Sequence, residues 1–292
     1  MSAVTIAVVT GTSTGIGFAT SLHLARHGYR VFAGMRNLAK AEPLRAAAAE
    51  AGLPVEVIAL DVTSGASVDE AFRTVAAAGP ADVLVNNAGL SGASPLELTP
   101  EAEHRAMFDT NYFGAIRSIQ AVLPGMRERR SGAIVNVTSV AGIIAIPNQI
   151  AYSASKWALE CAGEALAHEL WRFGVRVINV EPGVVMTSIF ENSAGATRYD
   201  KTSPYQPLMR RNGKFYAAGF RNPSQPEDVA RCILDAITAK DYRLRWTVGK
   251  DAAGFAAGRS RVSDEAWIAM GADLSDEEYN RRMAEYFGIE LR

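Results

Sequence analysis

The sequence is poor in the residues that build metal sites and disulfide scaffolds. It has two cysteines, Cys161 and Cys232, and four histidines in 292 residues. Two cysteines are too few for a disulfide framework or an all-cysteine zinc site, so we expect both to be buried small side chains in a reducing compartment. His23 and His27 are four residues apart, but no glutamate follows His23 to complete a zinc-protease motif. The sequence therefore predicts no metal site.

An excess of charge of either sign is also absent. Lysine and arginine number 30 and aspartate and glutamate number 31, which leaves a formal net charge of −1. A general nucleic-acid binder needs a basic surface that releases phosphate counterions, so we expect no nucleic-acid partner. Hydrophobic residues make up 48% and charged residues 21%, which is typical of a folded globular protein rather than a disordered chain.

Long apolar runs, repeats and low-complexity tracts are missing as well. No run approaches the roughly 18–20 residues that a membrane-spanning helix needs, so we expect no membrane span. The first residues, MSAVTIAVVTG, have neither a basic segment nor a small-residue cleavage site. The sequence therefore predicts a cytoplasmic protein, and its start is typical of a strand that leads into a glycine turn.

The sequence does contain a regular alternation of β-branched runs and helix-like stretches. Expected strands cover residues 4–9, 29–33, 55–59, 82–85, 133–137, 175–180 and 243–248. Expected helices cover residues 15–27, 39–50, 67–78, 100–129, 152–173 and 226–240. Near-continuous apolar strands between helices predict a parallel sheet that is buried on both faces. We therefore expect a single-domain α/β protein with a Rossmann-like, doubly wound, seven-stranded parallel sheet and helices on both faces.

Two segments interrupt this alternation. Residues 188–225 contain prolines 204, 207 and 223 without a clear period, and we expect a substrate-binding lid loop there. Its aromatic side chains either close over a hydrophobic ligand or pack within the loop, and its six basic residues either attract an anion or form a solvated surface. These are the aromatic residues Phe190, Tyr199, Tyr205 and Phe215 and the basic residues Arg198, Lys201, Arg210, Arg211, Lys214 and Arg221. Residues 251–292 are expected to form a helical extension, with helices over 264–270 and 275–287, packed on the domain of residues 1–250.

A glycine-rich turn follows the first expected strand. The segment from Thr10 to Gly17 is TGTSTGIG, and the first expected helix begins within it. Its spacing differs from G-x-G-x-x-G, but the physical basis is the same. Glycine lets a pyrophosphate approach backbone N–H groups at a helix N-terminus. The alternative is a glycine-rich turn without a ligand, and the position after the first strand of a β-α-β unit favours a dinucleotide site.

The end of the second expected strand indicates which dinucleotide is bound. An acidic residue there accepts a hydrogen bond from the 2′-hydroxyl of NAD, whereas an arginine pairs with the 2′-phosphate of NADP. This sequence has Ala33-Gly34-Met35-Arg36-Asn37 at that place, with no acid. Arg36 is either a phosphate ligand or a solvated surface charge. We expect NADP(H) as the favoured cofactor, with NAD(H) possible.

Tyr152 and Lys156 are candidates for proton transfer. They are four residues apart in an expected helix and therefore lie on one face. A tyrosine with its ordinary pKa of about 10 is a poor acid or base near neutral pH, and a nearby ammonium group stabilises the phenolate and lowers that pKa. Ser139, 13 residues before Tyr152 at a strand end, is placed to hold the substrate oxygen beside it. Lys156 can also hold the nicotinamide ribose.

Together these features resemble the short-chain dehydrogenases/reductases, over roughly residues 4–250. The motifs occur in order along the chain: the glycine turn at 10–17, Asp61-Val62, Asn86-Asn87-Ala88-Gly89, Asn111, Ser139, Tyr152-Ser153-Ala154-Ser155-Lys156, Pro182-Gly183 and Thr187. Each motif alone is a weak signal, but each lies at its expected strand end or on its expected helix. Residues 31–36 are similar to the 17β-hydroxysteroid and retinol dehydrogenase branch, which hints at a bulky apolar alcohol or ketone as substrate.

The resemblance implies where the cofactor is held. Asp61 and Val62 hold the adenine, residues 87–89 line the cofactor, and residues 182–187 hold the nicotinamide amide. The expected cofactor-binding residues are Gly11, Ser13, Thr14, Gly15, Ile16, Gly17, Arg36, Asp61, Val62, Asn87, Ala88, Gly89, Tyr152, Lys156, Pro182, Gly183, Val185 and Thr187. The family's second NADP-favouring signal, a basic residue at the Thr14 position, is missing.

The resemblance also adds Asn111 to the catalytic set, as the residue that positions a water linking Lys156 to solvent. The expected catalytic residues are Asn111, Ser139, Tyr152 and Lys156. We expect the substrate pocket to be lined by residues 91–96, 140–149, 184–186 and the 188–225 segment.

The predicted function is that of an NADP(H)-dependent oxidoreductase that interconverts a small-molecule carbonyl compound and a secondary or primary alcohol, with Tyr152 as general acid/base. An alternative is a catalytically weak NADP(H)-binding sensor, a class that tends to lose the tyrosine or lysine kept here. A third is an epimerase or dehydratase that recycles bound NAD, which usually has a larger C-terminal substrate domain. The helices over 100–129 and 152–173 resemble those through which family members dimerise, and their apolar residues include Phe113 and Trp157. We therefore expect a homodimer or homotetramer.

Overall fold

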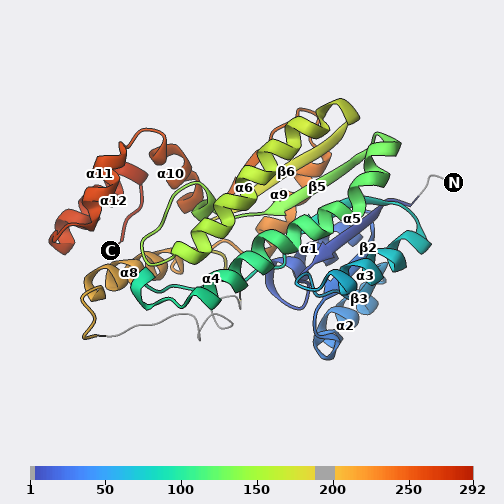
Figure 1. Cartoon of the computed structure of the whole chain (residues 1–292), viewed down its shortest axis with the longest axis horizontal. Helices are drawn as coiled ribbons and strands as arrows, with labels where there is room; N and C mark the ends of the chain where they lie inside the picture. The colour runs from blue at the N-terminus through green and yellow to red at the C-terminus, as the bar shows by residue number, and fades with distance from the viewer. Residues whose placement is uncertain (1–3, 188–200, 292) are drawn as a thin grey trace.

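Seven strands form one parallel sheet in the part of the chain that the computed structural model describes, residues 4–187 and 201–291 (Figure 1). Their order across the sheet is β3-β2-β1-β4-β5-β6-β7. The strands are β1 (Ile6–Thr10), β2 (Arg30–Met35), β3 (Val55–Ala59), β4 (Ala81–Asn86), β5 (Gly132–Val137), β6 (Val175–Pro182) and β7 (Arg245–Val248). The predicted doubly wound, single-domain sheet is confirmed. Because the strand order reverses between β1 and β4, a crevice opens at the carboxyl ends of these strands.

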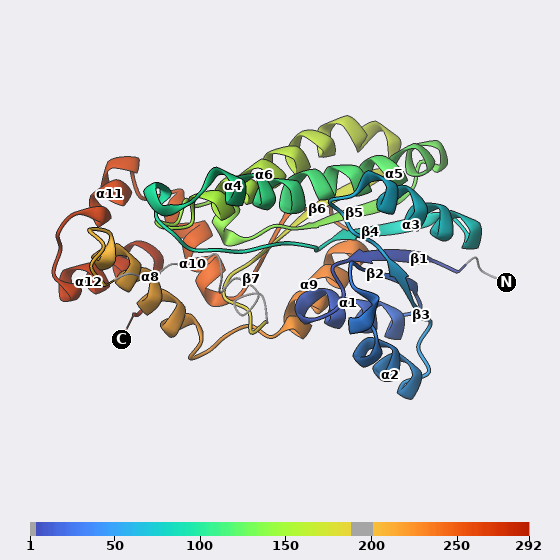
Figure 2. The ribbon, with the colours of Figure 1, turned by 60° about the horizontal axis from the view of Figure 1, so that its bottom comes forward.

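Helices cover both faces of this sheet (Figure 2). One layer consists of α1 (Gly15–Arg26), α2 (Glu42–Glu50) and α9 (Pro226–Thr238). The opposite layer consists of α3 (Gly65–Ala78), α4 (Glu101–Phe108), α5 (Gly114–Arg129) and α6 (Ile150–Leu170). The molecule is therefore a three-layer sandwich, as the alternation of strands and helices in the sequence predicts.

The side chains of β1 show how one sheet supports two cores. Ala7 and Val9 pack in the core beneath α1 and α9, whereas Ile6 and Val8 pack in the core beneath α3 and α5. Successive side chains of a strand point to opposite faces, so a strand that is covered on both sides must be apolar throughout. All five residues of β1 are buried. The strand therefore holds the glycine turn that follows it on a rigid base.

The segment at 188–225 differs from the irregular loop that the sequence predicts. It contains the helix α8 (Gln206–Gly219), with Pro207 in its first turn, where proline is tolerated. Met209, Arg211 and Phe215 are buried on this helix. The helix was not predicted because Pro204 and Pro207 interrupt the helical period of the sequence and because its buried face includes Arg211. Residues 188–200, with Phe190, Tyr199 and Arg198, lie outside the described residues.

The long helix expected over 100–129 is divided in two. A π-helical turn, Asp109–Phe113, joins α4 to α5 and carries Asn111. Such turns insert one extra residue into a helix and occur frequently at functional sites. Hydrophobic periodicity does not detect this insertion, because the apolar pattern continues on both sides of it.

The C-terminal residues form more helix than the sequence predicts. The helix α10 (Lys250–Arg259) was not expected, whereas α11 (Asp264–Ile268) and α12 (Asp276–Phe287) were. These three helices and α8 share a third core with residues of the sheet domain. Its buried members are Val140, Ile144, Val184, Phe215, Ala252, Phe255, Met270, Met283, Phe287, Ile289 and Leu291. The extension therefore packs against the loops that follow β5 and β6.

Over residues 4–187 and 201–291, no group of three metal-ligating side chains occurs, and no helix is both long and apolar enough to cross a membrane. His27 Nδ1 contacts the carbonyl oxygen of His23 at 2.8 Å on the surface of α1. The expectation of two buried cysteines is wrong for Cys161, which is exposed on α6 because its side chain points away from the face of the helix that carries the buried Glu160. Cys232 is partly buried, and burial raises the pKa of its thiol to about 11.

Candidate active site

A cavity of about 550 Å³ lies at the carboxyl ends of the strands and collects most of the predicted site residues. Those that line it are Gly11, Ser13, Thr14, Gly15, Ile16, Arg36, Asp61, Val62, Asn87, Ala88, Gly89, Ser139, Tyr152, Lys156, Pro182, Gly183, Val185 and Thr187. Gly17 and Asn111 are not part of its wall. The cavity is elongated between the glycine turn and the start of α6, and so can hold an extended ligand.

Hydrogen bonds connect the glycine turn to the residues that follow β4. Thr10 Oγ1 accepts hydrogen bonds of 3.0 Å from the N–H groups of Asn87 and Ala88. Asn87 Nδ2 donates back to the carbonyl oxygens of Thr10 and Gly11, at 2.9 and 3.0 Å. Gly11 has a φ of +71°, and a Cβ on it would be 2.7 Å from the Ala88 Cα. A Cβ on Gly17 would overlap the Gly11 carbonyl, so this glycine is needed for packing of α1 against the turn.

The N-terminus of α1 faces the cavity and carries no acidic side chain in its first turn. Backbone N–H groups and the positive end of the helix dipole are therefore available to an anion there. Gly15 also has a positive φ, +60°, and its Cβ position is close to Thr187, at 3.2 Å. This narrow, glycine-lined cradle fits the pyrophosphate of a dinucleotide.

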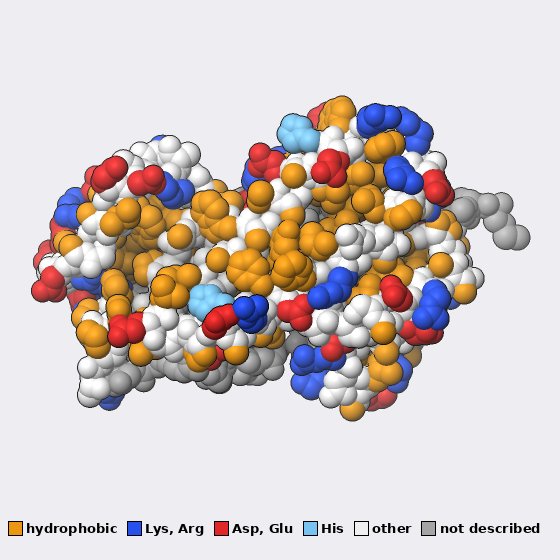
Figure 3. All heavy atoms as spheres, in the orientation of Figure 1, with side chains coloured by type: hydrophobic (Ala, Val, Ile, Leu, Met, Phe, Trp, Pro, Cys, Tyr) orange, Lys and Arg blue, Asp and Glu red, His pale blue; other side chains and the backbone are white. Residues whose placement is uncertain are grey.

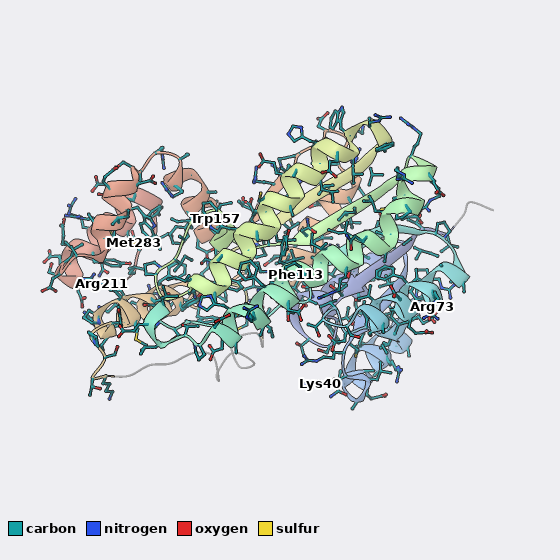
Figure 4. The ribbon with its side chains drawn as sticks, in the orientation of Figure 1. Lys40, Arg73, Phe113, Trp157, Arg211 and Met283 are labelled. Atoms are coloured by element: carbon teal, nitrogen blue, oxygen red, sulfur yellow. The ribbon has the colours of Figure 1, made fainter. Side chains whose placement is uncertain are left out.

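Two basic side chains line the cavity beyond the end of β2. Arg36 follows the strand, and Lys40, which Figure 4 labels, ends the short 3₁₀ turn Leu38–Lys40. Asn37 Oδ1 accepts from the N–H of Ala39 at 3.0 Å and so fixes the start of this turn. Both cationic side chains are exposed. The sequence predicts Arg36 as a cofactor residue but gives no signal for Lys40, which is four residues further along the chain.

Ser139 and Tyr152 both line the cavity, close enough for Ser139 to influence the pKa of the Tyr152 phenol. Ser139 Oγ follows β5 and accepts from the N–H of Ala141 at 3.1 Å, which caps the turn Val140–Gly142. Tyr152 lies in the first turn of α6. Burial raises the pKa of Tyr152 above its ordinary value, and the Ser139 hydroxyl opposes this rise. The phenol is therefore protonated in the cavity and is a donor to an oxygen placed beside it.

The pKa of Tyr152 thus moves in the direction opposite to the one that the sequence predicts. Lys156 Nζ is 5.8 Å from the centroid of the Tyr152 ring and donates to the Val137 carbonyl at 2.9 Å. Burial lowers the pKa of Lys156 to about 8, and the charge of Glu160 opposes this decrease. Desolvation acts on both partners, so it outweighs the stabilisation of the phenolate that their spacing alone suggests.

Asn111 is buried in the π-helical turn and its side chain is fully used. Its Oδ1 accepts from the N–H of Leu90 at 2.7 Å. Its Nδ2 donates to the Leu90 carbonyl at 3.0 Å and to Ser155 Oγ at 2.9 Å. Asn111 therefore ties the loop after β4 to α6, next to Lys156. The water relay expected of it stays a prediction.

Glu160 is a buried carboxylate that the sequence analysis missed, one helical turn after Lys156. It accepts hydrogen bonds from Thr138 Oγ1 at 2.5 Å, Asn179 Nδ2 at 2.8 Å and Arg245 Nε at 3.1 Å. It therefore connects the residue before Ser139 with α6, β6 and β7. Beside it, burial and the charge of Glu160 raise the pKa of Glu181 to about 7, while Arg245 opposes the rise.

A hydrogen bond to the C-terminal extension holds the turn after β6. Asp251, in the first turn of α10, accepts from the N–H of Val184 at 2.7 Å. A Cβ on Gly183 would overlap this carboxylate, so the close contact requires glycine. The α10 helix therefore sets the position of the segment that was expected to hold the nicotinamide. Sequence reasoning missed Asp251 because no local motif marks it.

Further cavity residues were also missed, and two of them form a polar pair. Gln149 Nε2 donates to the hydroxyl of Tyr216, and both residues line the cavity. Burial raises the pKa of Tyr216 above its ordinary value. Gln149 Oε1 has no hydrogen-bond partner among the described residues. Gln149 falls within the expected pocket segment 140–149, but Tyr216 belongs to the helix that the sequence did not reveal.

Comparison with known proteins now identifies the family. The model of the family described as short chain dehydrogenase matches residues 5–197, about two thirds of the chain. The chain therefore belongs to the short-chain dehydrogenases/reductases and is an oxidoreductase of that family. This family uses NAD(P)(H).

Two curated relatives come from the branch that the second strand resembles. The chain is 39% identical to human retinol dehydrogenase 8 over 255 residues, which cover 82% of this chain and 79% of the relative. It is 35% identical to estradiol 17-beta-dehydrogenase 1 of Rattus norvegicus over 253 residues, covering 83% and 73%. The resemblance to the retinol and steroid dehydrogenase branch is confirmed.

Solved structures share the fold. A short-chain dehydrogenase from Streptomyces avermitilis is 34% identical with a TM-score of 0.80, covering 94% of this chain and all of that one. An actinorhodin polyketide ketoreductase in complex with NADPH is 29% identical with a TM-score of 0.72, covering 84% and 95%.

Proposed function

We propose that this protein interconverts a carbonyl compound and a secondary or primary alcohol with NADP(H), and that Tyr152 is the general acid/base. The observation that carries the proposal is that Ser139, Tyr152 and Lys156 line the same cavity as the glycine turn. One cavity therefore contains both a proton donor and a cradle that fits a dinucleotide. Family membership supports the reaction class, and the two relatives named above act, by their names, on retinol and estradiol.

Each catalytic side chain has a distinct task in this proposal. Ser139 donates a hydrogen bond to the substrate oxygen, and Tyr152 delivers a proton to that oxygen during reduction or removes it during oxidation. Lys156 supplies positive charge beneath the Tyr152 ring and holds the nicotinamide ribose. Asn111 keeps the Gly89–Leu90 segment against α6. When bound, the nicotinamide supplies or accepts the hydride.

The adenosine end of the cavity supports NADP(H) over NAD(H). Arg36 and Lys40 both line it, and charge-assisted hydrogen bonds from two cations suit a 2′-phosphate. Lys40 supplies the second charge that is missing at Thr14. The remaining cofactor residues proposed from the sequence, among them Asp61 and Val62, line the same end.

The proposed function is tested by following oxidation of NADPH and NADH side by side, over a panel of carbonyl compounds from small diketones to steroids and retinal. We expect turnover of at least one compound, with NADPH preferred. Faster turnover with NADH would show that Arg36 and Lys40 are surface charges. Tight NADPH binding with no turnover of any compound would contradict the reductase proposal.

The pH dependence of the reaction is expected to depend on Glu160. Its negative charge favours the charged form of Lys156, so Glu160→Gln lowers the Lys156 pKa below about 8. The alkaline limb of the profile of kcat/KM for reduction then moves to lower pH, because Lys156 loses its charge earlier. Glu164→Gln is the matched control, since Glu164 also pairs with Arg245 but is exposed. An unchanged profile for Glu160→Gln would contradict the role assigned to Lys156.

An exposed apolar surface supports the proposed homodimer or homotetramer. Phe113 and Trp157 are 47% and 46% exposed, and hydrophobic side chains gather around them over α5 and α6 (Figure 3). A contiguous apolar surface of this kind favours protein contact. We expect the double substitution Phe113→Glu and Trp157→Glu to produce a monomer by light scattering after size exclusion. Leu38→Glu, at another exposed apolar residue, is the control and keeps the oligomer. If the wild-type protein is a monomer, the proposed oligomer is wrong.

The cytoplasmic location expected from the sequence stays a prediction.

A further inference from the structure

An arginine outside the cavity holds the loop that is expected to contact the adenine. This loop follows β3 and carries Asp61 and Val62, which line the adenosine end of the cavity. Arg117 lies near the start of α5 and is not part of the cavity wall. Its Nη1 donates to the Val62 carbonyl at 3.0 Å, although the two residues are 55 positions apart in the sequence. The proton transfer described above makes no use of this contact.

The same guanidinium also bonds to the π-helical turn. Its Nη2 donates to Asp109 Oδ1 at 2.7 Å, and its Nη1 donates to the Asp109 carbonyl oxygen at 3.4 Å. Asp109 is the first residue of this turn, and Figure 4 labels Phe113, the last. A planar guanidinium can direct donors at several fixed acceptors at once, which a single ammonium group does less well. Arg117 therefore connects the loop after β3 to the turn that precedes α5.

Packing brings the loop and the helix together at the same place. A Cβ on Gly114, the first residue of α5, would be 2.7 Å from Val62 Cγ2, so the Val62 side chain lies directly on the helix. The helices α3 and α5 also lie side by side in one layer (Figure 2). Apolar contact is not directional, whereas a hydrogen bond is. The bond from Arg117 therefore sets the orientation of the Val62 carbonyl, which packing alone leaves free.

The remaining hydrogen bonds of the loop act on its other side. Asp61 Oδ1 accepts from the N–H and the hydroxyl of Thr63, at 3.0 and 2.7 Å. The N–H of Asp61 donates to Ser67 Oγ at 2.9 Å. These contacts shape the loop internally and attach it to α3. Arg117 attaches it to α5, on the opposite flank.

We propose that Arg117 is a positioning residue for the adenosine half of the cofactor, which it serves by orienting the Val62 peptide group without touching the cofactor. The inference rests on the proposed function, because it takes NADP(H) as the cofactor. Without Arg117 the loop leaves the binding orientation for part of the time, and the apparent affinity falls in proportion. The catalytic end should not change, because Asn111 keeps its own hydrogen bonds to Leu90 and Ser155.

The test measures the two halves of the cofactor site separately. Adenosine 2′,5′-bisphosphate, the adenosine half of NADP, and NADPH are titrated by calorimetry into the wild type and Arg117→Met. We expect Kd to rise for both ligands by about tenfold or more, the change that loss of one charge-assisted hydrogen bond produces. The value of kcat at saturating NADPH should equal that of the wild type. Arg127→Met is the matched control, since Arg127 is an exposed arginine in the last turn of the same helix, and it should change neither Kd.

A conservative variant separates positioning from a general structural role. Arg117→Lys keeps a charged donor for the Val62 carbonyl and should recover most of the affinity for the bisphosphate. Wild-type affinity in Arg117→Met, or an affinity in Arg117→Lys as low as in Arg117→Met, would overturn the proposal. A fall of kcat at saturating NADPH as large as the loss of affinity would also overturn it, because the whole site would then be disturbed.

The proposal stays testable if Arg117→Met does not fold. Arg117→Gln then takes its place, because it removes the charge and retains a polar side chain, and the same rise in Kd is expected. The binding measurements need no turnover, so failure of the carbonyl reaction is a separate result. A wild-type protein that binds neither NADPH nor the bisphosphate would overturn the proposed function instead.

Discussion

Tyr152→Phe is expected to lower kcat for carbonyl reduction by about 10³-fold, within the usual range for loss of a general acid. The substitution removes one oxygen from a side chain that is held in the wall of the cavity beside Ser139. Phenylalanine keeps the ring and its contact with Lys156, so the fold and the affinity for NADPH should remain close to those of the wild type. Steady-state kinetics and a fluorescence titration with NADPH measure the two effects separately.

The matched control for this experiment is Tyr242→Phe. Tyr242 also uses its hydroxyl as a donor, to the Val177 carbonyl at 2.8 Å, but it does not line the cavity of the candidate active site. We expect this variant to turn over like the wild type. Retention of more than a tenth of the activity in Tyr152→Phe would mean that another group or water protonates the substrate oxygen, and the role assigned to Tyr152 would be wrong.

Removal of the two cations at the end of β2 is expected to abolish the preference for NADPH. A charge-assisted hydrogen bond contributes about 1.5–3 kcal/mol, which corresponds to roughly 10- to 150-fold for each cation. Arg36→Ala and Lys40→Ala should each lower kcat/KM with NADPH and leave the value with NADH unchanged, and the double variant should lower it further. Both side chains are exposed, so we expect no loss of thermal stability.

Arg45→Ala is the control for general charge, because Arg45 is an exposed cation on α2 that does not line the cavity. It should leave the ratio of NADPH to NADH turnover unchanged. A preference for NADPH that survives in the Arg36/Lys40 double variant would show that recognition of the cofactor depends on other groups. An equal fall with NADH would show that these side chains hold the adenosine rather than the 2′-phosphate.

The sheet and the core of the site were predictable because their signals are local. Each parallel strand is a short apolar run, and the glycine turn and the Tyr152–Lys156 spacing lie within single segments of the chain. The carboxyl ends of parallel strands meet at one edge, so the residues that follow each strand had to converge. This is why Ser139, Asn87 and Pro182 line one cavity although they are far apart in the sequence.

The parts that were missed depend on contacts between distant segments. The Asp251 carboxylate accepts a hydrogen bond from the Val184 N–H, and the Glu160 carboxylate accepts hydrogen bonds from Thr138 and Arg245. These partners are distant in the sequence, so no pattern around either carboxylate reveals them. The pKa of Tyr152 was predicted in the wrong direction for the same reason, because spacing shows a neighbouring lysine but not the burial of both groups. Helix α8 was missed because its buried face includes Arg211, a residue type that is almost never fully buried.

The single carboxylate of Asp251 has a consequence for protein engineering. Substrate range in such enzymes is an obvious target for chimeras that exchange the C-terminal residues, since these pack against the loops that follow β5 and β6. In this chain, however, the first turn of that extension also anchors the backbone that follows β6. A crossover placed before Asp251 would exchange this anchor together with the C-terminal helices. A crossover after Phe255 would keep the anchor and transfer only the helices beyond it.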